Sequence, residues 1–198
     1  MLEVKNLHRP GLNPVSLRIE TGECFALMGL SGSGKSLILR AIADLDPNEG
    51  MVKANGASRA LMPAPAWRKL VGFLPSDSGW WGEIVGAHME KSDFVTVLLS
   101  KMHLPEEALS WPVTRLSTGE KQRLALIRLL ALRPKVLLLD EPTSALDAEA
   151  RTSVEAVLES QLASGVSILL TTHDKKQAKR LSNHILRLEN GSLSEANQ

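Results

Sequence analysis

Apolar and polar residues alternate along this chain in a pattern that predicts strands interleaved with helices. Residues 2–7 and 15–19 alternate apolar with polar side chains, which predicts two strands with one buried face. Largely apolar runs predict strands at 24–28, 71–74, 136–139 and 166–170, and the strand at 136–139 is expected to be buried on both faces. Apolar residues at helical spacing predict helices at 35–43, 120–132 and 148–162. This alternation favours a mainly parallel sheet, in which ligands bind beyond the carboxyl ends of the strands.

Two further segments lie between these elements. Residues 55–66 are rich in Ala and Pro, so we predict a connection there rather than a helix or strand. The pattern between 83 and 111 is helical, and Pro105 is expected to open a further short helix. Its helical spacing is carried by Phe94, Val97, Leu98 and Lys101. We therefore predict a small helical insertion in the α/β core.

Composition and charge narrow the class of protein. The 198 residues suit one globular domain, and 43% hydrophobic with 23% charged residues allow a sizeable core. A net charge of +1 leads us to expect no nucleic-acid partner. The single cysteine, Cys24, cannot form an internal disulfide, which fits a reducing, cytosolic setting. Since no apolar run reaches the roughly 18 to 20 residues that cross a bilayer, a partner would have to supply any membrane span.

A glycine-rich segment lies between the predicted strand at 24–28 and the predicted helix at 35–43. It matches the pattern G-x-x-x-x-G-K-[ST] with Gly29, Leu30, Ser31, Gly32, Ser33, Gly34, Lys35 and Ser36. In this pattern backbone N–H groups face nucleotide phosphates, Lys35 neutralises charge and the Ser36 hydroxyl can ligate Mg²⁺. The alternative is a flexible glycine turn that matches by chance. The loop alone fits kinases, GTPases and motor ATPases equally well, because all share this device.

Two carboxylates, Asp140 and Glu141, follow the buried strand predicted at 136–139. At the carboxyl end of a strand both should face the phosphates. Asp140 would hold Mg²⁺ directly or through water, and Glu141 would act as general base on the attacking water. The alternative is structural, with both acids capping the turn at Pro142.

A third motif introduces the apolar helix predicted at 120–132. Ser117 and Glu120 satisfy the S-x-x-E capping box, which explains both residues without any function. The same helix start carries free N–H groups and a positive dipole end, which together form an anion site. The two interpretations are compatible, and residue chemistry alone does not choose between them.

Residues 116–147, LSTGEKQRLALIRLLALRPKVLLLDEPTSALD, resemble the signature-to-D-loop block of the ATP-binding cassette family, and the resemblance covers nearly the whole chain. It implies an α/β P-loop NTPase fold, with a mainly parallel sheet core, an N-terminal antiparallel β part and a small helical insertion. It further implies a single nucleotide-binding domain over 1–198. Its core would comprise 1–75 and 117–198, with the insertion at about 76–116.

The resemblance also implies roles for particular residues. Ser117, Thr118, Gly119 and Glu120 would bind ATP held by a second copy of the chain, so that two chains sandwich two ATP molecules head to tail. Residues 144–147 would form the D-loop at that seam, and residues 171–174 the switch region. His173 would contact the γ-phosphate and act with Glu141 in catalysis. A single histidine is more often structural, but the end of a buried strand favours function.

The chain departs from the family pattern at several positions. Ser76 stands where the family has a glutamine that reaches Mg²⁺ and the attacking water, and a serine is too short for both contacts. No tyrosine is present, and near the start only His8 and Pro10 stand where an aromatic residue stacks on adenine. Leu37, at the nucleotide-binding loop, replaces a threonine, and Thr118 replaces a glycine of the signature. These changes predict weaker ATP binding and slower turnover.

The expected function is an ATPase that binds ATP and Mg²⁺ and powers a separate transmembrane permease. Such a subunit would lie in the cytoplasm, peripheral on the cytoplasmic face of the inner membrane. Trp80 and Trp81 follow the region that contacts the membrane subunit in this family, so either they dock a permease loop or they pack in the core. A soluble cassette not coupled to transport and a non-hydrolysing regulatory cassette are the alternatives. Neither the cargo nor its direction follows from the sequence.

Overall fold

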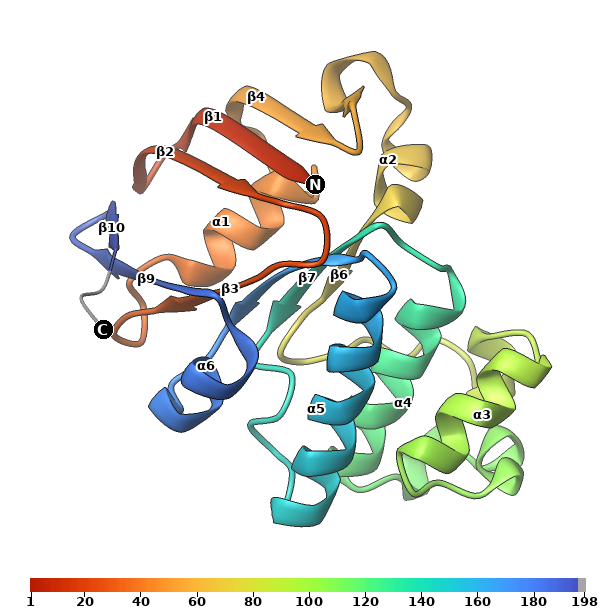
Figure 1. Cartoon of the computed structure of the whole chain (residues 1–198). Helices are drawn as coiled ribbons and strands as arrows, with labels where there is room; N and C mark the ends of the chain where they lie inside the picture. Colours follow the sequence, from red (N-terminus) through yellow and green to blue (C-terminus); the bar gives the residue numbers. More distant parts are fainter. Residues whose placement is uncertain (196–198) are drawn as a thin grey trace.

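The computed structural model describes residues 1–195 and arranges them as two β-sheets with helices between and around them (Figure 1). The strands are β1 (Leu2–Arg9), β2 (Leu12–Ile19), β3 (Cys24–Met28), β4 (Glu49–Ala54), β5 (Ala57–Ser58), β6 (Val71–Leu74), β7 (Val136–Asp140), β8 (Ser167–Thr171), β9 (His184–Glu189) and β10 (Ser192–Glu195). The α-helices are α1 (Lys35–Ile42), α2 (Ala64–Leu70), α3 (Asp93–Lys101), α4 (Thr118–Ala131), α5 (Ala148–Ala163) and α6 (Lys175–Leu181). Short 3₁₀ turns are η1 (Arg59–Leu61), η2 (Val85–His88), η3 (Glu106–Ser110) and η4 (Val113–Arg115).

The larger sheet has six strands in the order β10-β9-β3-β8-β7-β6. All of its neighbouring strands run parallel except the terminal pair of β9 and β10, which is antiparallel. Every residue of β7 and β8 is buried, as expected for parallel strands that are covered on both faces. The predicted α/β fold with a mainly parallel core is confirmed.

Two apolar cores lie on opposite faces of this sheet. Leu137 and Leu139 of β7 pack into a core with α3, α4 and α5, whereas Val136 and Leu138 pack into a second core with α1. This alternation follows from the two-residue period of a strand. The Cys24 thiol is fully buried in the first core, and burial raises its pKa to about 12, which fits a packing role.

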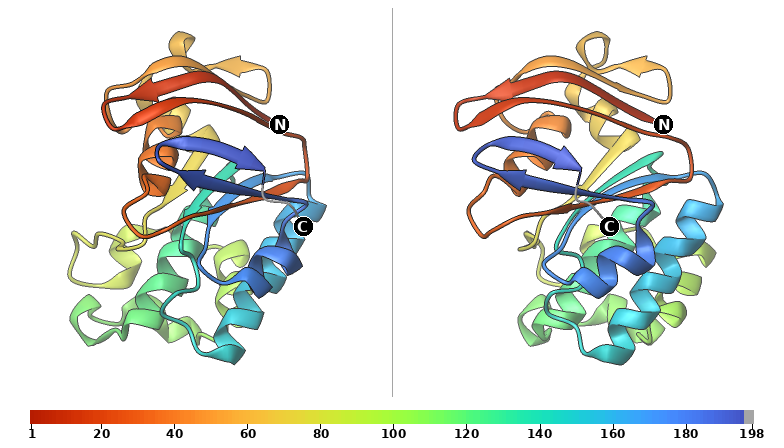
Figure 2. Two further views of the ribbon diagram at one scale, coloured as in Figure 1. Left: turned by 90° about the vertical axis from the view of Figure 1, so that its left-hand side faces the viewer. Right: turned by 60° about the vertical axis from the view of Figure 1, so that its left-hand side comes forward.

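The smaller sheet has the order β2-β1-β4-β5, and all its paired strands are antiparallel. It lies above α1 in Figures 1 and 2 and shares the second core with that helix. The antiparallel N-terminal part is therefore confirmed, although β4 was not foreseen. The β4 strand passes so close to β1 that a Cβ at Gly50 would lie 2.4 Å from the Asn6 carbonyl oxygen, so only glycine fits there.

The prediction that residues 55–66 form a connection is wrong. This segment contains β5, η1 and the first turn of α2, and Pro65 occupies one of the first helical positions of α2. Proline is tolerated in the first turn because its missing N–H would have no partner there. The helix is held by Trp67, which is fully buried and donates its Nε1–H to the Ile42 carbonyl at 2.9 Å. Tertiary burial of one side chain thus outweighs an unfavourable local composition.

Residues 76–116 contain α3 and the 3₁₀ turns η2, η3 and η4, and they are drawn in yellow to light green in Figure 1, where α3 lies beside α4. The predicted helix is confirmed as α3, whose N-cap residue Ser92 accepts the Val95 N–H through its hydroxyl. The short helix expected after Pro105 is confirmed as η3. No helix within residues 1–195 is long and apolar enough to cross a membrane.

Candidate functional site

The glycine-rich loop runs from the end of β3 to the start of α1. A Cβ at Gly29 would lie 2.6 Å from the Leu188 carbonyl oxygen, so no larger residue fits. Gly34 is the N-cap of α1 and has the left-handed φ of 103°, which a glycine adopts without strain. The loop therefore leads directly into a helix start, whose free N–H groups favour an anion.

Lys35 lies along the inside of this loop. Its side chain is almost fully buried, and its Nζ donates to the carbonyls of Gly29 and Leu30, both at 2.9 Å. The Ser33 hydroxyl is buried without a hydrogen-bond partner in the described chain, which marks it as a group suited to a bound ligand. The exposed residues of the loop region are Leu30, Ser31, Gly32 and Ser36, and Leu37 is half-buried.

Strand register brings the expected chemistry to one edge of the sheet. Leu27 of β3 is paired with Thr171 of β8, and Thr171 is paired with Asp140 of β7. Because these three strands are parallel and adjacent, the glycine-rich loop, the carboxylates and the switch region all leave the sheet at the same edge.

Thr171 connects the two carboxylate positions. Its hydroxyl donates to Asp140 Oδ1 at 2.7 Å and accepts the backbone N–H of Glu141 at 3.0 Å. Glu141 has the left-handed φ of 51°, which is uncommon for a residue with a side chain. Such conformations cluster at functional sites.

The two residues expected to be catalytic form an ion-pair contact. His173 Nε2 lies 2.6 Å from Glu141 Oε1, and the two side chains are 51% and 26% exposed respectively. His173 is therefore not a core histidine. The structure brings together Asp140, Glu141 and His173, which the sequence places up to 33 residues apart.

The signature residues adopt the geometry of a capping box at the start of α4. Ser117 Oγ accepts the Glu120 N–H at 3.3 Å, and Glu120 Oε2 accepts the Ser117 N–H at 2.8 Å. The hydrogen bond that the Ser117 N–H donates to the Glu120 carboxylate holds the pKa of that carboxyl below its usual value. Ser117 and Thr118 are nevertheless exposed, and Gly119 is only partly covered. The capping role is confirmed, and the first turn of α4 remains open to a ligand or partner.

Gln122, to which sequence reasoning gave no role, links this helix to the segment that carries Glu141. Its side-chain Nε2 donates to the Glu141 carbonyl at 2.7 Å, and its Oε1 accepts the Ala145 N–H at 3.3 Å. A Cβ at Gly119 would lie 3.3 Å from the Ala145 carbonyl, so the signature also touches the D-loop. The available signal was one glutamine among the apolar residues of a buried helix.

The structure also shows where the residues that depart from the family pattern lie. Ser76 is exposed at the carboxyl end of β6, next to Pro75. The His8 ring lies beside Glu49, with its Nε2 3.4 Å from the carboxylate. Pro10 is exposed in the turn between β1 and β2. No aromatic side chain occupies the β1–β2 turn, residues 10 and 11.

Oxygen donors suitable for Mg²⁺ are available at this edge. Asp140 uses Oδ1 to accept from Thr171, which leaves Oδ2 as a ligand, and the Ser36 hydroxyl is exposed at the start of α1. Mg²⁺ commonly takes only one or two protein oxygens and completes its shell with water and substrate phosphates. Among residues 1–195, acidic, histidine and cysteine side chains form no group of three or more that could hold a metal ion by themselves.

Comparison with known proteins identifies the family. The family model described as ABC transporter matches residues 12–144. The chain is 35% identical to the aliphatic sulfonates import ATP-binding protein SsuB of Corynebacterium glutamicum, over 92% of this chain and 76% of that protein. It is 33% identical to the Fe(3+) ions import ATP-binding protein FbpC of Pseudomonas fluorescens, over 98% of this chain and 60% of that protein.

Solved structures agree with this assignment. An ATP-binding subunit of an ABC transporter superimposes with a TM-score of 0.88 and 28% identity, over 98% of this chain and 90% of that chain. A dimeric ATP-binding cassette in a post-hydrolysis state, bound to ADP and Pi, gives a TM-score of 0.79 and 25% identity over all of both chains. The fold and site thus define an ATP-binding cassette. The chain belongs to the ABC transporter family, and it resembles that family's ATP-binding subunits.

Replacing Thr171 with valine tests the bonds that join Asp140 and Glu141. We expect Thr171→Val to lower the free energy of unfolding by about 1–3 kcal/mol, because a buried carboxylate oxygen and a backbone N–H lose their partner. The exposed Thr152→Val on α5 is the matched control and should change stability by less than about 0.5 kcal/mol. Urea unfolding followed by tryptophan fluorescence measures both. Equal effects in the two variants would contradict a structural role for Thr171.

Proposed function

We propose that this chain binds ATP with Mg²⁺ in the glycine-rich loop and hydrolyses it to power a membrane transporter. The observation that carries the proposal is the contact of Glu141 with His173 at the sheet edge from which the glycine-rich loop also emerges. A carboxylate that is held by an imidazole beside a phosphate-binding loop can accept a proton from water. The proposed unit is a single nucleotide-binding domain, with residues 76–116 as its helical insertion.

In the proposed mechanism, different residues bind the phosphates and transfer the proton. Lys35 and the N–H groups at the start of α1 bind the phosphates and stabilise charge on the γ-phosphoryl group. Glu141 takes a proton from the water whose oxygen attacks the γ-phosphorus, and the bond to the β-phosphate oxygen breaks to give ADP and phosphate. His173 orients Glu141 through their contact. Ser36 and Asp140 would hold Mg²⁺, which would supply positive charge against the phosphates.

We further propose that a second copy of the chain completes each site. The exposed first turn of α4 presents the N–H groups of Thr118 and Gly119, which the capping box does not use, and a positive dipole end to an anion. The exposed Ser117 hydroxyl lies beside them. The similar cassette that was solved as a dimer with ADP and Pi supports this arrangement. Two equal interfaces related by two-fold symmetry would then close both sites together.

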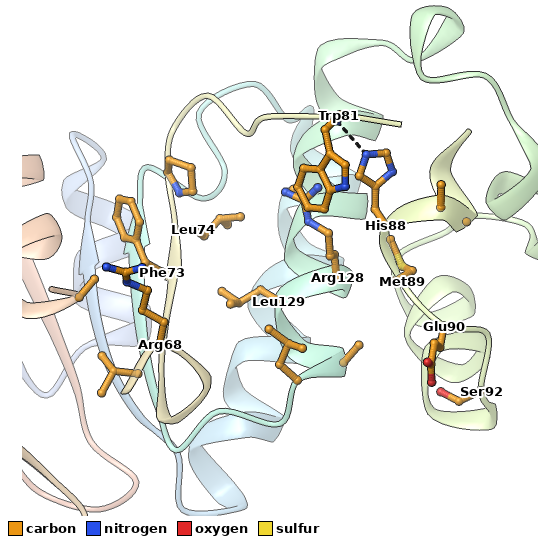
Figure 3. Close-up of a pocket in the computed structure, with 18 of the residues that line it drawn as sticks. Arg68, Phe73, Leu74, Trp81, His88, Met89, Glu90, Ser92, Arg128 and Leu129 are labelled. Atoms are coloured by element: carbon orange, nitrogen blue, oxygen red, sulfur yellow. Dashed lines mark hydrogen bonds between the residues drawn. The ribbon is translucent and has the colours of Figure 1, made fainter. Parts of the chain in front are cut away.

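The proposed membrane partner is a separate permease, as the import names of the relatives suggest. A cavity of about 1260 Å³ lies between β6, α4 and the segment 81–92, and it is a suitable docking place (Figure 3). The two tryptophans differ there, because Trp80 packs against the core whereas Trp81 is 75% exposed at the cavity. We therefore place Trp81 at the permease contact, and the chain on the cytoplasmic face of the membrane.

The Trp81 side chain is held ready for such a contact. His88 Nε2 accepts the N–H groups of Trp81 and Gly82, both at 2.9 Å, which fixes the turn that carries the indole. The Arg128 guanidinium lies 4.9 Å from the Trp81 ring centroid, within cation–π range. An exposed aromatic that is fixed in place loses little entropy on binding, which favours a hot spot.

Replacing Glu141 with glutamine tests the proposed hydrolysis. We expect Glu141→Gln to lower kcat for ATP hydrolysis by about 10²- to 10⁴-fold, because the amide cannot accept the proton from water. ATP affinity, measured by calorimetry, should stay close to the wild-type value. The exposed Glu159→Gln on α5 removes the same charge and should keep wild-type kcat. A wild-type chain that binds ATP without hydrolysing it, also with permease present, would instead support a non-hydrolysing regulatory cassette.

Adding a negative charge at the signature residues tests the proposed interface with a second copy of the chain. In the Glu141→Gln background ATP should drive the chain into dimers, as measured by light scattering after size exclusion. We expect Thr118→Glu to abolish this dimer, because its carboxylate repels the triphosphate of the other chain. The same carboxylate favours the helix start, so the fold should persist. Thr114→Glu, exposed before the signature, should leave the dimer intact, and equal dimer loss in both variants would argue against the proposed interface.

Truncating the exposed indole tests the docking site. We expect Trp81→Ala to reduce the amount of chain that sediments with membrane vesicles from its source by about tenfold or more, as for loss of a hot-spot aromatic. Leu61→Ala truncates another exposed apolar residue, outside the cavity lining, and should sediment like the wild type. Protease-treated vesicles should retain neither protein, because the partner is a permease and not lipid. Unchanged sedimentation of Trp81→Ala would show that docking does not use Trp81.

A further inference from the structure

Gln177 of α6 is a buried polar residue that the hydrolysis mechanism does not use. It is 1% exposed, and both ends of its side-chain amide are bonded. The amide oxygen accepts the Thr172 hydroxyl at 2.8 Å, and the amide nitrogen donates to the Thr143 hydroxyl at 2.7 Å. One side chain therefore joins two loops that leave different strands of the sheet.

A neighbouring ion pair settles which way this amide points. Glu155 of α5 accepts from Gln177 Nε2 at 3.1 Å. Arg180 binds the same carboxylate with two hydrogen bonds, at 2.9 and 2.8 Å. Because the carboxylate only accepts, the amide nitrogen must face Glu155 and Thr143, and the amide oxygen must face Thr172. If the amide were flipped, its oxygen would face the Glu155 carboxylate, and neither group could donate a hydrogen bond to the other. Only one orientation of the amide is therefore stable.

The two loops that Gln177 joins are those that carry the catalytic pair. Thr172 directly precedes His173, and Thr143 lies two residues after Glu141. Asp174, on the other side of His173, donates its N–H to Thr172 Oγ1 at 3.0 Å and caps α6 by accepting the Gln177 N–H. The backbone on both sides of His173 is thus tied to the same helical turn.

We propose that Gln177 is a positioning residue that sets the separation between His173 and Glu141 and makes the two loops move together. The proposal rests on the proposed function, in which that pair acts on the attacking water. Each side-chain nitrogen and oxygen atom of Thr143, Glu155, Thr172 and Gln177 has at least one hydrogen-bond partner, so the network resists a change in one loop unless the other loop follows. A shift of the switch loop when phosphate leaves would then be carried through Gln177 to Thr143 and on to the D-loop at 144–147.

The test compares variants that cut the link at its centre and at each end. Gln177→Met keeps the length of the side chain but makes none of the three hydrogen bonds of the amide. Thr143→Val removes the bond at one end of the link, and Thr172→Val removes the bond at the other end together with the bond from the Asp174 N–H. We expect each to lower kcat for ATP hydrolysis by about 10- to 100-fold, because a small misplacement of catalytic groups has an effect of that size. KM for ATP should change by less than about twofold, since phosphate binding lies in another loop.

A matched control separates positioning from simple loss of stability. Ser167 is also a buried hydroxyl of the sheet, but it lies at the amino end of β8, where it donates to the Glu20 carbonyl at 2.9 Å. Ser167→Ala should lower the melting temperature about as much as Thr172→Val and leave kcat unchanged. If Thr143→Val and Thr172→Val are combined, their effects on kcat should not multiply, because either one already breaks the link.

Hydrogen exchange tests the link without relying on turnover. In Gln177→Met we expect amides of residues 141–144 and of 172–174 to exchange about tenfold faster, because both loops lose the bond that holds them. Ser167→Ala should leave both loops protected. Faster exchange in only one loop, or wild-type kcat in a folded Gln177→Met, would overturn the proposal. Absence of hydrolysis in the wild type would instead refute the proposed function, while exchange would still decide whether Gln177 couples the loops.

Discussion

The burial of β7 and β8 on both faces is the constraint on which the rest of the structure depends. Strands covered by apolar layers on each side cannot carry exposed polar groups along their length, so their functional chemistry is confined to the ends. In this chain Asp140 and Thr171 close these strands and bond to each other. The buried sheet thus supplies a rigid edge from which the glycine-rich loop, the carboxylates and the switch loop emerge together.

Hydrogen bonds from side chains convert this edge into a defined site. Thr171 links Asp140 with the backbone of Glu141, Gln122 holds the same segment to the signature helix, and Gln177 joins it to the loop of His173. Each of these groups is buried, so a missing partner would leave an unsatisfied polar atom in the core. The segment that carries Glu141 is therefore held from three directions, and the Gln122 side chain joins it to the signature helix.

The local features of the fold could be predicted because they depend on neighbours in the chain. The glycine-rich loop, the strand before it and the helix after it can be predicted because the motif is a fixed pattern of residues that are close together in the sequence. Other elements depend on distant partners: α2 contains Pro65 and forms around the burial of Trp67 under α1. The strand β4 begins with Glu49 and Gly50, which are unfavourable in a strand, and it is held by its pairing with β1. Patterns of a few residues do not contain such information.

The candidate site shows the same division. Sequence by itself determined which chemical group stands at the end of each strand, including the carboxylates at the end of β7 and His173 after β8, because covalent neighbours remain neighbours in any fold. Only the tertiary structure decided which of these groups meet. The strand order β3-β8-β7 differs from their order in the chain, and the bond between Gln177 and Thr143 spans 34 residues. Such contacts arise when helices and strands pack to bury their apolar faces, which no local spacing specifies.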